Sequence, residues 1–330
     1  MAATRPTVHG LHHVTSIAAA PQENLDFYVG VMGLRLVKRS VNQDAPGTYH
    51  LFYADEAGTP GTDLTFFPWP DMAPVREGFG QAREVQFGVA PGSAGWWRER
   101  LESRGFEAGT PAPRFGESTL PLRDPHGHRI ALVETEDERP WIPWEGAPVP
   151  AERQLRGMHA VCMVVRELAP TRRVLEDVLG FEEVGEEDGW RRFGVEGGGS
   201  GRWLEIREEP DARLGRWGTG GVHHVAWQVE DDREQMALRE RLVDAGLQVT
   251  PPIDRFWFRS VYFKEPGGVL FELATMGPGF ERDETRDALG ESLILPPWLE
   301  PRRAAIESAL PPLEVPASVG ASEPPAARAP

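Results

Sequence analysis

The chain has 330 residues and a formal net charge of −16, from 35 basic and 51 acidic side chains. This length accommodates two domains of ordinary size, each with its own core. The acidic balance argues against nucleic acid and anionic membranes as partners, because phosphate binding needs a basic face. A single cysteine, Cys162, excludes an intrachain disulfide, and no apolar stretch is long enough to cross a membrane, so we expect a cytoplasmic protein.

The first predicted strand opens with the phrase Gly10-Leu11-His12-His13-Val14 and continues as an apolar run with period-two character. A helical pattern follows over residues 21–32 and ends at Gly33, with the apolar Leu34 behind it, as is typical of a glycine helix stop. Strands are then predicted at residues 34–41, 48–53 and 64–67, with turn signals between them. The first unit is therefore a βαβββ module.

The same order of elements recurs three times along the chain. The later modules open at Glu84, Gly157 and Gly221, and each has a helical pattern that ends at a glycine. An apolar residue follows each of these glycines, which are Gly105, Gly180 and Gly246. Internal repetition of this kind predicts an α+β protein built from four βαβββ modules.

We expect two paired-module domains. Modules 1 and 2 would form an N-terminal domain over residues 8–135, and modules 3 and 4 a C-terminal domain over residues 157–276. Residues 136–156, rich in Pro, Glu and Trp, are predicted to be a linker. Residues 277–330 form a C-terminal extension with a short helical pattern at 304–310, and its last 20 or so residues are rich in Pro, Ala and Ser and are predicted to be disordered.

Two histidine pairs, His12-His13 and His223-His224, open strands that lie far apart in the chain. Neighbouring side chains of a strand point to opposite faces, so one histidine of each pair can reach a shared ion. Histidine at the first position recurs in modules 1, 3 and 4, where it can serve the scaffold or support a ligand. Histidine at the second position occurs only in modules 1 and 4, since module 3 has Ala160 there. His13 and His224 are therefore the better ligand candidates.

The last strand of module 4 carries one carboxylate, Glu272, in an otherwise apolar run. Counting from the turn proline, the corresponding residues are Ala131 in module 2 and Phe66 in module 1. A single buried His or Glu is more often a core residue, but a buried carboxylate needs a compensating charge. His13, His224 and Glu272 form the ligand set of a mononuclear non-haem iron site, so modules 1 and 4 are expected to face each other around Fe(II), with Mn(II) as the alternative.

These motifs resemble the vicinal oxygen chelate superfamily, which includes glyoxalase and the extradiol dioxygenases, and more narrowly the ring-cleaving dioxygenases that act on hydroquinones. The resemblance covers residues from about 9 to 290. It rests on residues 10–15, 37–41, 49–55, 58–62, 114–116, 221–225 and 266–272. The resemblance implies the vicinal oxygen chelate fold and metal ligands at His13, His224 and Glu272. It also implies a pocket tyrosine at Tyr262, a pocket arginine at Arg255, and a residue supporting the metal ligands at His223.

The function that the resemblance implies is an Fe(II)-dependent, extradiol-type dioxygenase that inserts O2 into a hydroquinone or related phenolic ring. Three protein ligands on an octahedral ion leave positions for a substrate oxygen, O2 and water. Tyr262 would hydrogen-bond the substrate oxygen, and His223 or Arg255 would support proton transfer or orientation. The expected partners are a small aromatic substrate and O2, and a homo-oligomer stays open.

Two other functions stay open as well. A glyoxalase-like lyase or isomerase of the same fold usually needs four protein ligands, and Phe66 at the fourth position counts against it. A non-catalytic protein that binds quinones or drugs would not need His13, His224 and Glu272 together. Glu205 of module 3 is a weaker carboxylate candidate, because its module offers only His159 beside it.

Overall fold

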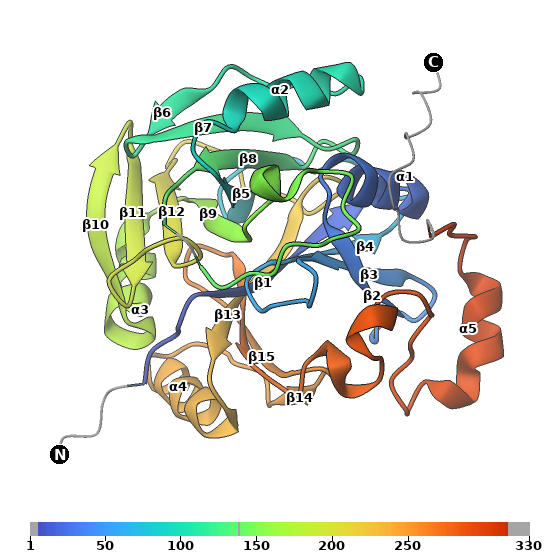
Figure 1. Ribbon diagram of the computed structural model, residues 1–330. Coiled ribbons are helices and arrows are strands. Elements are labelled where there is room, and N and C mark those ends of the chain that lie inside the picture. The colour runs from blue at the N-terminus through green and yellow to red at the C-terminus, as the bar shows by residue number, and fades with distance from the viewer. Residues whose placement is uncertain (1–5, 138, 316–330) are drawn as a thin grey trace.

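The four βαβββ modules are present in the computed structural model, which describes residues 6–137 and 139–315 (Figure 1). Module 1 comprises β1 (Leu11–Ala18), α1 (Pro21–Leu25), the π-helical turn η1 (Asp26–Val31), β2 (Arg35–Val41), β3 (Tyr49–Ala54) and β4 (Asp63–Pro68). Module 2 comprises β5 (Gln81–Val89), α2 (Ala94–Ser103), β6 (Ala112–Arg114), β7 (Glu117–Arg123) and β8 (Arg129–Glu134). The predicted α+β class and module content are confirmed.

The second half of the chain repeats this order after a short helical turn, η2 (Ala151–Arg153), in the linker. Module 3 comprises β9 (Met158–Val165), α3 (Leu168–Val174), the π-helical turn η3 (Leu175–Leu179), β10 (Phe181–Glu187), β11 (Trp190–Val195) and β12 (Trp203–Glu208). Module 4 comprises β13 (Val222–Val229), α4 (Asp232–Asp244), β14 (Ile253–Asp254), β15 (Arg259–Lys264) and β16 (Leu270–Thr275).

The glycine helix stops work as the sequence indicates. Gly33 and Gly180 both have positive φ, 74° and 87°, a region that a side chain disfavours. A Cβ at Gly33 would also lie 2.6 Å from the side chain of Val149 in the linker. Helix α4 of module 4 also has a capped start, since the carboxylate of Asp231 accepts a hydrogen bond from the backbone N–H of Glu234.

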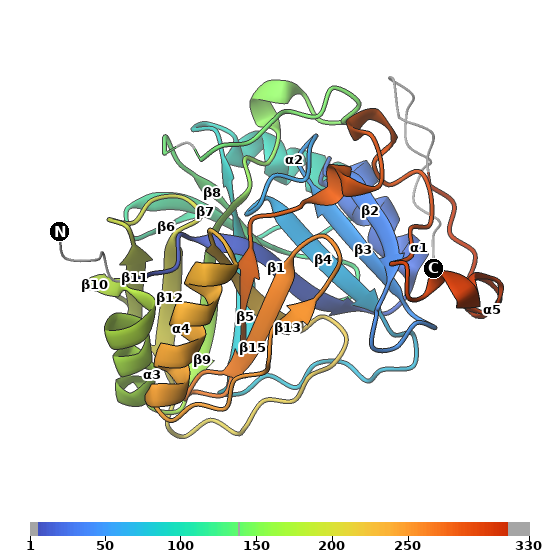
Figure 2. The same cartoon turned by 90° about the horizontal axis from the view of Figure 1, so that it is seen from below.

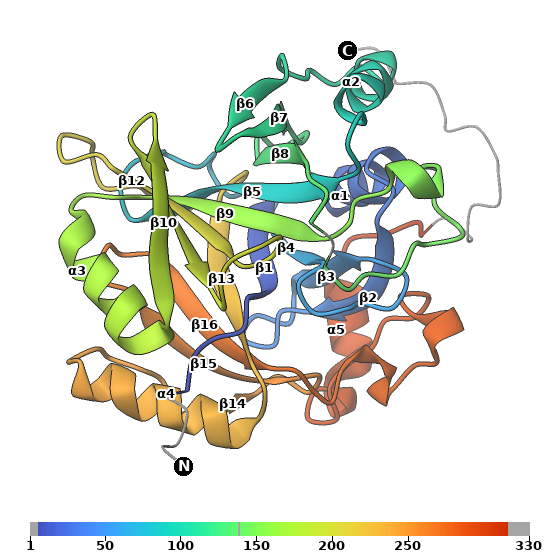
Figure 3. The same cartoon turned by 60° about the vertical axis from the view of Figure 1, so that its left-hand side comes forward.

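The modules combine into two curled eight-stranded sheets (Figure 3). One sheet has the order β14-β15-β16-β13-β1-β4-β3-β2 and joins modules 4 and 1, whereas the other has the order β10-β11-β12-β9-β5-β8-β7-β6 and joins modules 3 and 2. Each sheet therefore takes one module from either side of the linker. The sheets do not follow the expected grouping of residues 8–135 and 157–276, because the free edges of β1 and β13 pair with each other, as do those of β5 and β9.

The helices lie on the outer sides of the sheets and group differently from the strands (Figures 1 and 2). The helices of modules 1 and 2 meet where the guanidinium of Arg100 on α2 donates to the carbonyl oxygens of Val31 and Gly30 at 2.9 and 3.1 Å. Helix α4 of module 4 packs beside η3 of module 3. Sheets thus join modules 1 with 4 and 2 with 3, while helices join 1 with 2 and 3 with 4. No helix of the described residues is long and apolar enough to cross a membrane.

The C-terminal extension covers the outer edge of the sheet of modules 1 and 4. Its helical segments are η4 (Phe280–Arg282), η5 (Arg286–Ala288), η6 (Glu300–Arg302) and α5 (Arg303–Ala309). The backbone N–H of Ile294 donates to the carbonyl oxygen of Arg39 on the edge strand β2 at 2.9 Å, which protects an otherwise open strand edge. In the stretch predicted to be disordered, Leu313 and Val315 pack against the core, and residues 316–330 lie outside the described residues.

Candidate metal centre

Three neighbouring strands bring the predicted ligands together. His13 lies on β1, His224 on β13 and Glu272 on β16, with β13 in the middle. His13 pairs across the sheet with Ala226, and Ala226 pairs with Glu272, so the two ligands flank a small residue on the central strand. His224 precedes Ala226 by two residues and therefore projects from the same face. The methyl group of Ala226 leaves the space between the three side chains open.

A β-bulge at each histidine pair modifies the expected alternation of side chains. The pairing of β1 with β13 runs Leu11–Trp227 and then His13–Ala226, so His12 is the extra residue of the first bulge. The second bulge makes His223 the extra residue of β13. Since a bulge re-aims neighbouring side chains, the rings within each pair come into contact although one histidine of each pair lies outside the ligand set.

The three candidate ligand atoms converge on one buried point. Nε2 of His13 lies 3.3 Å from Nε2 of His224, and these nitrogens lie 3.4 and 2.9 Å from Oε2 of Glu272. The three residues are 2, 5 and 0 % exposed. Oε1 of Glu272 accepts a hydrogen bond from the hydroxyl of Ser260 at 2.5 Å, whereas Oε2 accepts none among the described residues. One carboxylate oxygen is thus held and the other is available, which fits a bound cation.

The first histidine of each pair orients the second. Nδ1 of His12 lies 2.9 Å from Nδ1 of His13, and Nδ1 of His223 lies 2.8 Å from Nδ1 of His224. Burial lowers the pKa of both His12 and His223 to about 3, so these rings are neutral at pH 7 and can accept a hydrogen bond. His13 and His224 can then donate from Nδ1, which leaves the lone pairs of both Nε2 atoms directed at the site.

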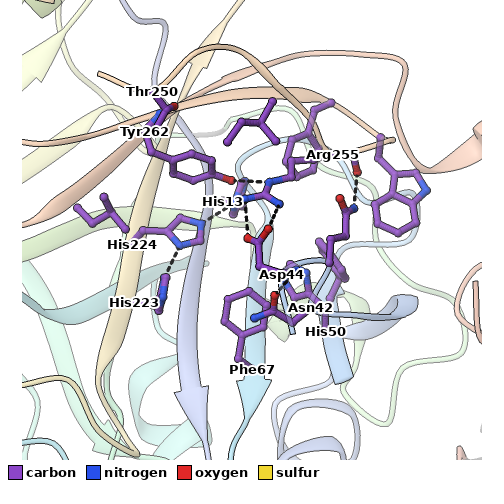
Figure 4. Close-up of a pocket in the computed structure, with 16 residues that line it drawn as sticks. His13, Asn42, Asp44, His50, Phe67, His223, His224, Thr250, Arg255 and Tyr262 are labelled. Carbon is purple, nitrogen blue, oxygen red and sulfur yellow. Dashed lines mark hydrogen bonds and ion pairs between the residues drawn. The ribbon is translucent and has the colours of Figure 1, made fainter. Parts of the chain in front are cut away.

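A pocket of about 390 Å³ opens beside these side chains (Figure 4). Both histidine ligand candidates line it, together with His223, Arg255 and Tyr262. Its apolar walls consist of Phe52, Phe67, Ile253, Trp257, Phe258 and Leu270. A cavity of about 150 Å³ can already hold benzene, so this pocket can take a substituted aromatic ring. The residues expected from the sequence to act together are therefore near one another.

Arg255 and Tyr262 form a connected pair at the pocket (Figure 4). Nε of Arg255 donates to the hydroxyl oxygen of Tyr262 at 3.2 Å. Tyr262 also pairs across the sheet with Glu272, which places its ring beside the carboxylate. Burial, and next the charge of Glu272, raise the pKa of the Tyr262 hydroxyl, so this group keeps its proton at neutral pH. Because Arg255 donates to the hydroxyl oxygen, Tyr262 acts as a donor through its own proton, and Ser260 is the other hydrogen-bonding group beside it.

One counted position was wrong, and one pocket residue was missed. Val14 of module 1 pairs with its counterpart Val225 of module 4, so the next residues, Thr15 and Ala226, also correspond. Thr15 pairs with Thr65 and Ala226 pairs with Glu272, so the counterpart of Glu272 is Thr65, not Phe66. The count from the turn proline erred by one because the turns differ in length. The missed pocket residue is His50, whose Nε2 lies 2.9 Å from the hydroxyl of Thr65. Burial lowers the pKa of His50 well below its usual value. A lone histidine in the apolar run of β3 was the available signal.

The second sheet has no comparable cluster among the described residues. Its pairing register puts Ala160 at the position of His13 and Ala131 at that of Glu272. Two carboxylates remain, Glu84 and Glu205, and the guanidinium of Arg114 bridges them at 2.7 and 2.6 Å. Arg192 also pairs with Glu205 at 2.7 Å, so guanidinium groups compensate these carboxylates, which excludes Glu205 from the candidate metal centre.

Comparison with known proteins places this chain in a family. The model of the Glyoxalase/Bleomycin resistance protein/Dioxygenase superfamily matches residues 10–132 and 157–273. A relative from Bacillus subtilis named "Putative ring-cleaving dioxygenase MhqO" is 40 % identical over 306 residues, covering 93 % of this chain and 97 % of the relative. The chlorohydroquinone/hydroquinone 1,2-dioxygenase of Sphingobium indicum is 33 % identical over 301 residues, covering 89 % of this chain and 93 % of that protein.

Solved structures agree with the fold. The crystal structure of a dioxygenase from Bacillus subtilis, itself named as putative, superposes with a TM-score of 0.88 at 40 % identity, covering 94 % of this chain and 99 % of that one. Glyoxalase I from Zea mays has a TM-score of 0.61 at 15 % identity over 81 % of this chain and 92 % of that one, which bears on the fold alone. With the family model matching both halves and relatives similar over nearly the whole length, the chain belongs to the Glyoxalase/Bleomycin resistance protein/Dioxygenase superfamily.

Proposed function

We propose that this protein is an Fe(II)-dependent, extradiol-type dioxygenase that opens the ring of a hydroquinone or related phenol with O2. The observation that carries the proposal is the convergence of His13, His224 and Glu272 on one buried point at the floor of an aromatic pocket. The similarity to the hydroquinone 1,2-dioxygenase of Sphingobium indicum supports the substrate class.

The donor set suits a divalent iron or manganese ion. Two imidazoles and one carboxylate on one side of an ion leave further positions open, an arrangement found in non-haem Fe(II) oxygenases. When bound, such an ion supplies Lewis-acid activation of a phenolic oxygen and a path for electrons to O2. The held Oε1 and the available Oε2 of Glu272 suit a carboxylate that binds through one oxygen.

The surrounding residues of the chain bind and orient the ring. The faces of Phe52, Phe67, Trp257 and Phe258 exclude water from an aromatic substrate. The hydroxyl of Tyr262 donates a hydrogen bond to a substrate oxygen that lies near Glu272, and Arg255 holds that hydroxyl in place. Neutral His223, stacked on Trp217 with 4.5 Å between ring centroids, accepts from His224 through Nδ1 and so carries its proton on Nε2. It can therefore donate a hydrogen bond that orients a ligand at the edge of the pocket.

A glyoxalase-like lyase or isomerase is less well supported. Such an enzyme usually needs a fourth protein ligand, and the position related to Glu272 in module 1 is Thr65. The hydroxyl of Thr65 already lies 2.7 Å from that of Thr15 and 2.9 Å from His50. A hydroxyl engaged in this way is a poor substitute for a carboxylate.

Metal analysis combined with oxygen uptake tests the proposal. We expect about one Fe(II) or Mn(II) per chain and hydroquinone-dependent consumption of O2. Replacing His13, His224 or Glu272 with Ala should abolish both. Replacing Glu205 with Ala is the matched control, since this substitution lies in the second sheet and should affect stability but not metal content. Full metal occupancy in the Glu272→Ala protein would contradict the carboxylate assignment, and a metal-loaded protein without oxygen uptake would contradict the dioxygenase proposal.

A further inference from the structure

Two side chains of opposite charge meet at the mouth of the pocket. Besides the histidines, Asp44 and Arg255 are the charged side chains among the described residues that line it. Nη2 of Arg255 lies 3.0 Å from Oδ2 of Asp44, and Nη1 lies 3.3 Å from Oδ1 (Figure 4). The side chain of Arg255 is 19 % exposed and that of Asp44 is 76 % exposed. The guanidinium therefore belongs to the pocket wall and the carboxylate to the rim.

Every nitrogen of the Arg255 guanidinium has a protein partner. Nε donates to the hydroxyl of Tyr262, and the two terminal nitrogens donate to Asp44 in a bidentate arrangement. An arginine in an aromatic pocket would otherwise be a strong site for a carboxylate on the substrate ring. Here the carboxylate of Asp44 already occupies that site.

The loop between β2 and β3 holds Asp44 in this place. The side-chain oxygen of Asn42 accepts hydrogen bonds from the backbone N–H groups of Asp44 and Ala45 at 2.9 and 3.2 Å. The side-chain amide of Gln43 donates to the carbonyl oxygen of Arg255 at 2.9 Å. The loop is thus tied to itself and to the residue that it neutralises, so Asp44 is pre-positioned over the guanidinium.

We propose that Asp44 sets the substrate class by occupying Arg255, so that the pocket accepts hydroquinones with uncharged ring substituents and rejects those with a ring carboxylate. This inference rests on the proposed function and names its substrate more closely. A ring carboxylate would have to displace Asp44 or share one guanidinium with it, and like charges so close repel each other. A methyl or halogen substituent carries no charge that competes with Asp44 for the guanidinium, so it leaves the ion pair intact.

The experiment compares two ligands of similar shape, methylhydroquinone and 2,5-dihydroxybenzoate, on the metal-loaded protein. Dissociation constants are measured without oxygen from tryptophan fluorescence, since Trp257 lines the pocket, and kcat/KM is measured by oxygen uptake. The wild-type protein should prefer methylhydroquinone by at least about tenfold, which corresponds to about 1.4 kcal/mol. Asp44→Asn should reduce this preference about tenfold or reverse it, whereas Asp44→Glu should retain it.

Two further variants test the route of the effect. In the double variant Asp44→Asn, Arg255→Gln, the gain in binding of 2,5-dihydroxybenzoate should disappear, because the freed guanidinium is gone. Asp232→Asn, which removes another exposed aspartate from its ion pair with Arg259 outside the pocket, should leave the preference unchanged. An unchanged preference in Asp44→Asn, or a gain that survives loss of Arg255, would overturn the role of Asp44. Failure of the wild type to consume O2 with any hydroquinone would instead count against the proposed function, and the binding comparison would still decide the role of Asp44.

Discussion

At the scale of single residues, Tyr262 contacts both Arg255 and the candidate ligand His224. It accepts from Arg255, its ring lies beside the candidate ligand His224 with 5.7 Å between centroids, and its pKa is raised by burial. A packing role would need only the ring. A role in the reaction would need the hydroxyl proton.

Replacing Tyr262 with Phe separates these two roles. We expect the variant to keep its fold and metal while kcat for hydroquinone falls by about 10² to 10⁴, the range for a positioned acid or base. The measurements are oxygen uptake, metal content and circular dichroism on the same preparation. Turnover at the wild-type rate would show that the hydroxyl has no part in the reaction, and His223 or Arg255 would become the next candidates.

At the scale of elements, the C-terminal extension is fixed to the sheet through a buried ion pair. The ammonium of Lys38 on β2 is fully buried, lies 2.7 Å from a carboxylate oxygen of Asp283 and contacts Glu284 as well. The other carboxylate oxygen of Asp283 accepts a hydrogen bond from the indole N–H of Trp257 at 3.0 Å. The extension therefore supports a wall of the pocket, although it lies outside the four modules.

We expect Lys38→Met to lower the free energy of unfolding by roughly 3–5 kcal/mol, because it leaves two carboxylates without their buried counter-charge. Arg303→Met is the matched control, since Arg303 pairs with the exposed Glu300 and Glu307 and its loss should cost at most about 1 kcal/mol. Denaturant titration of both variants gives the comparison. Equal losses would mean that Lys38 is no more important than a surface charge.

Glu117 links three strands of the second sheet and should make stability depend on pH. Its Oε2 lies 3.2 Å from Nε2 of His159 on β9 and 2.9 Å from Nη1 of Arg192 on β11. Burial by itself would raise the pKa of Glu117, but these two partners outweigh it and lower the pKa from 4.5 to about 2. A lowered carboxyl pKa stabilises the fold fully above the unfolded value, and this contribution is lost as the pH falls toward the folded value.

Glu117→Gln should therefore reduce the free energy of unfolding at pH 7, and the difference from wild type should shrink between about pH 4.5 and pH 2. Urea titrations at pH 7 and at successively lower pH values measure this difference. The exposed Glu99→Gln on α2 serves as the control, with no comparable change expected. A difference that stays constant with falling pH would show that the carboxylate charge of Glu117 does not stabilise the sheet.

At the scale of the whole molecule, the candidate metal centre joins the two ends of the repeat. His13 and His224 are 211 residues apart in sequence, and they meet because modules 1 and 4 share a sheet. The unfolded chain holds no such site. Metal binding should therefore stabilise the folded state, by about 2.7 kcal/mol at a free metal concentration about 100 times Kd.

Removal of the metal with a chelator should accordingly lower the Tm of the wild-type protein. The Glu272→Ala protein should show no such shift, because it has no metal to lose. Differential scanning calorimetry with and without chelator measures both. A Tm that does not respond to the chelator in metal-loaded wild type would show that the ion does not couple the two modules.

The sequence by itself determined the modules and the candidate ligands. Hydrophobic periodicity and glycine helix stops are local features, so they predict each βαβββ unit without knowledge of its neighbours. Comparison of equivalent repeat positions selected His13, His224 and Glu272, because a function confined to two of four modules leaves an asymmetry in residue type. The three side chains are indeed neighbours in the structure.

The ligand set already implied that modules 1 and 4 face each other, but only the tertiary structure showed that they share one continuous sheet and that modules 2 and 3 share the other. The edges of β1, β5, β9 and β13 offer similar backbone groups, and choosing among them depends on packing between distant segments. The bulges at His12 and His223 also cannot be predicted from the local sequence, since a bulge is defined by the pairing with the partner strand. Asp44 gave no signal in the sequence, because an exposed loop aspartate is ordinary until the fold sets it against Arg255.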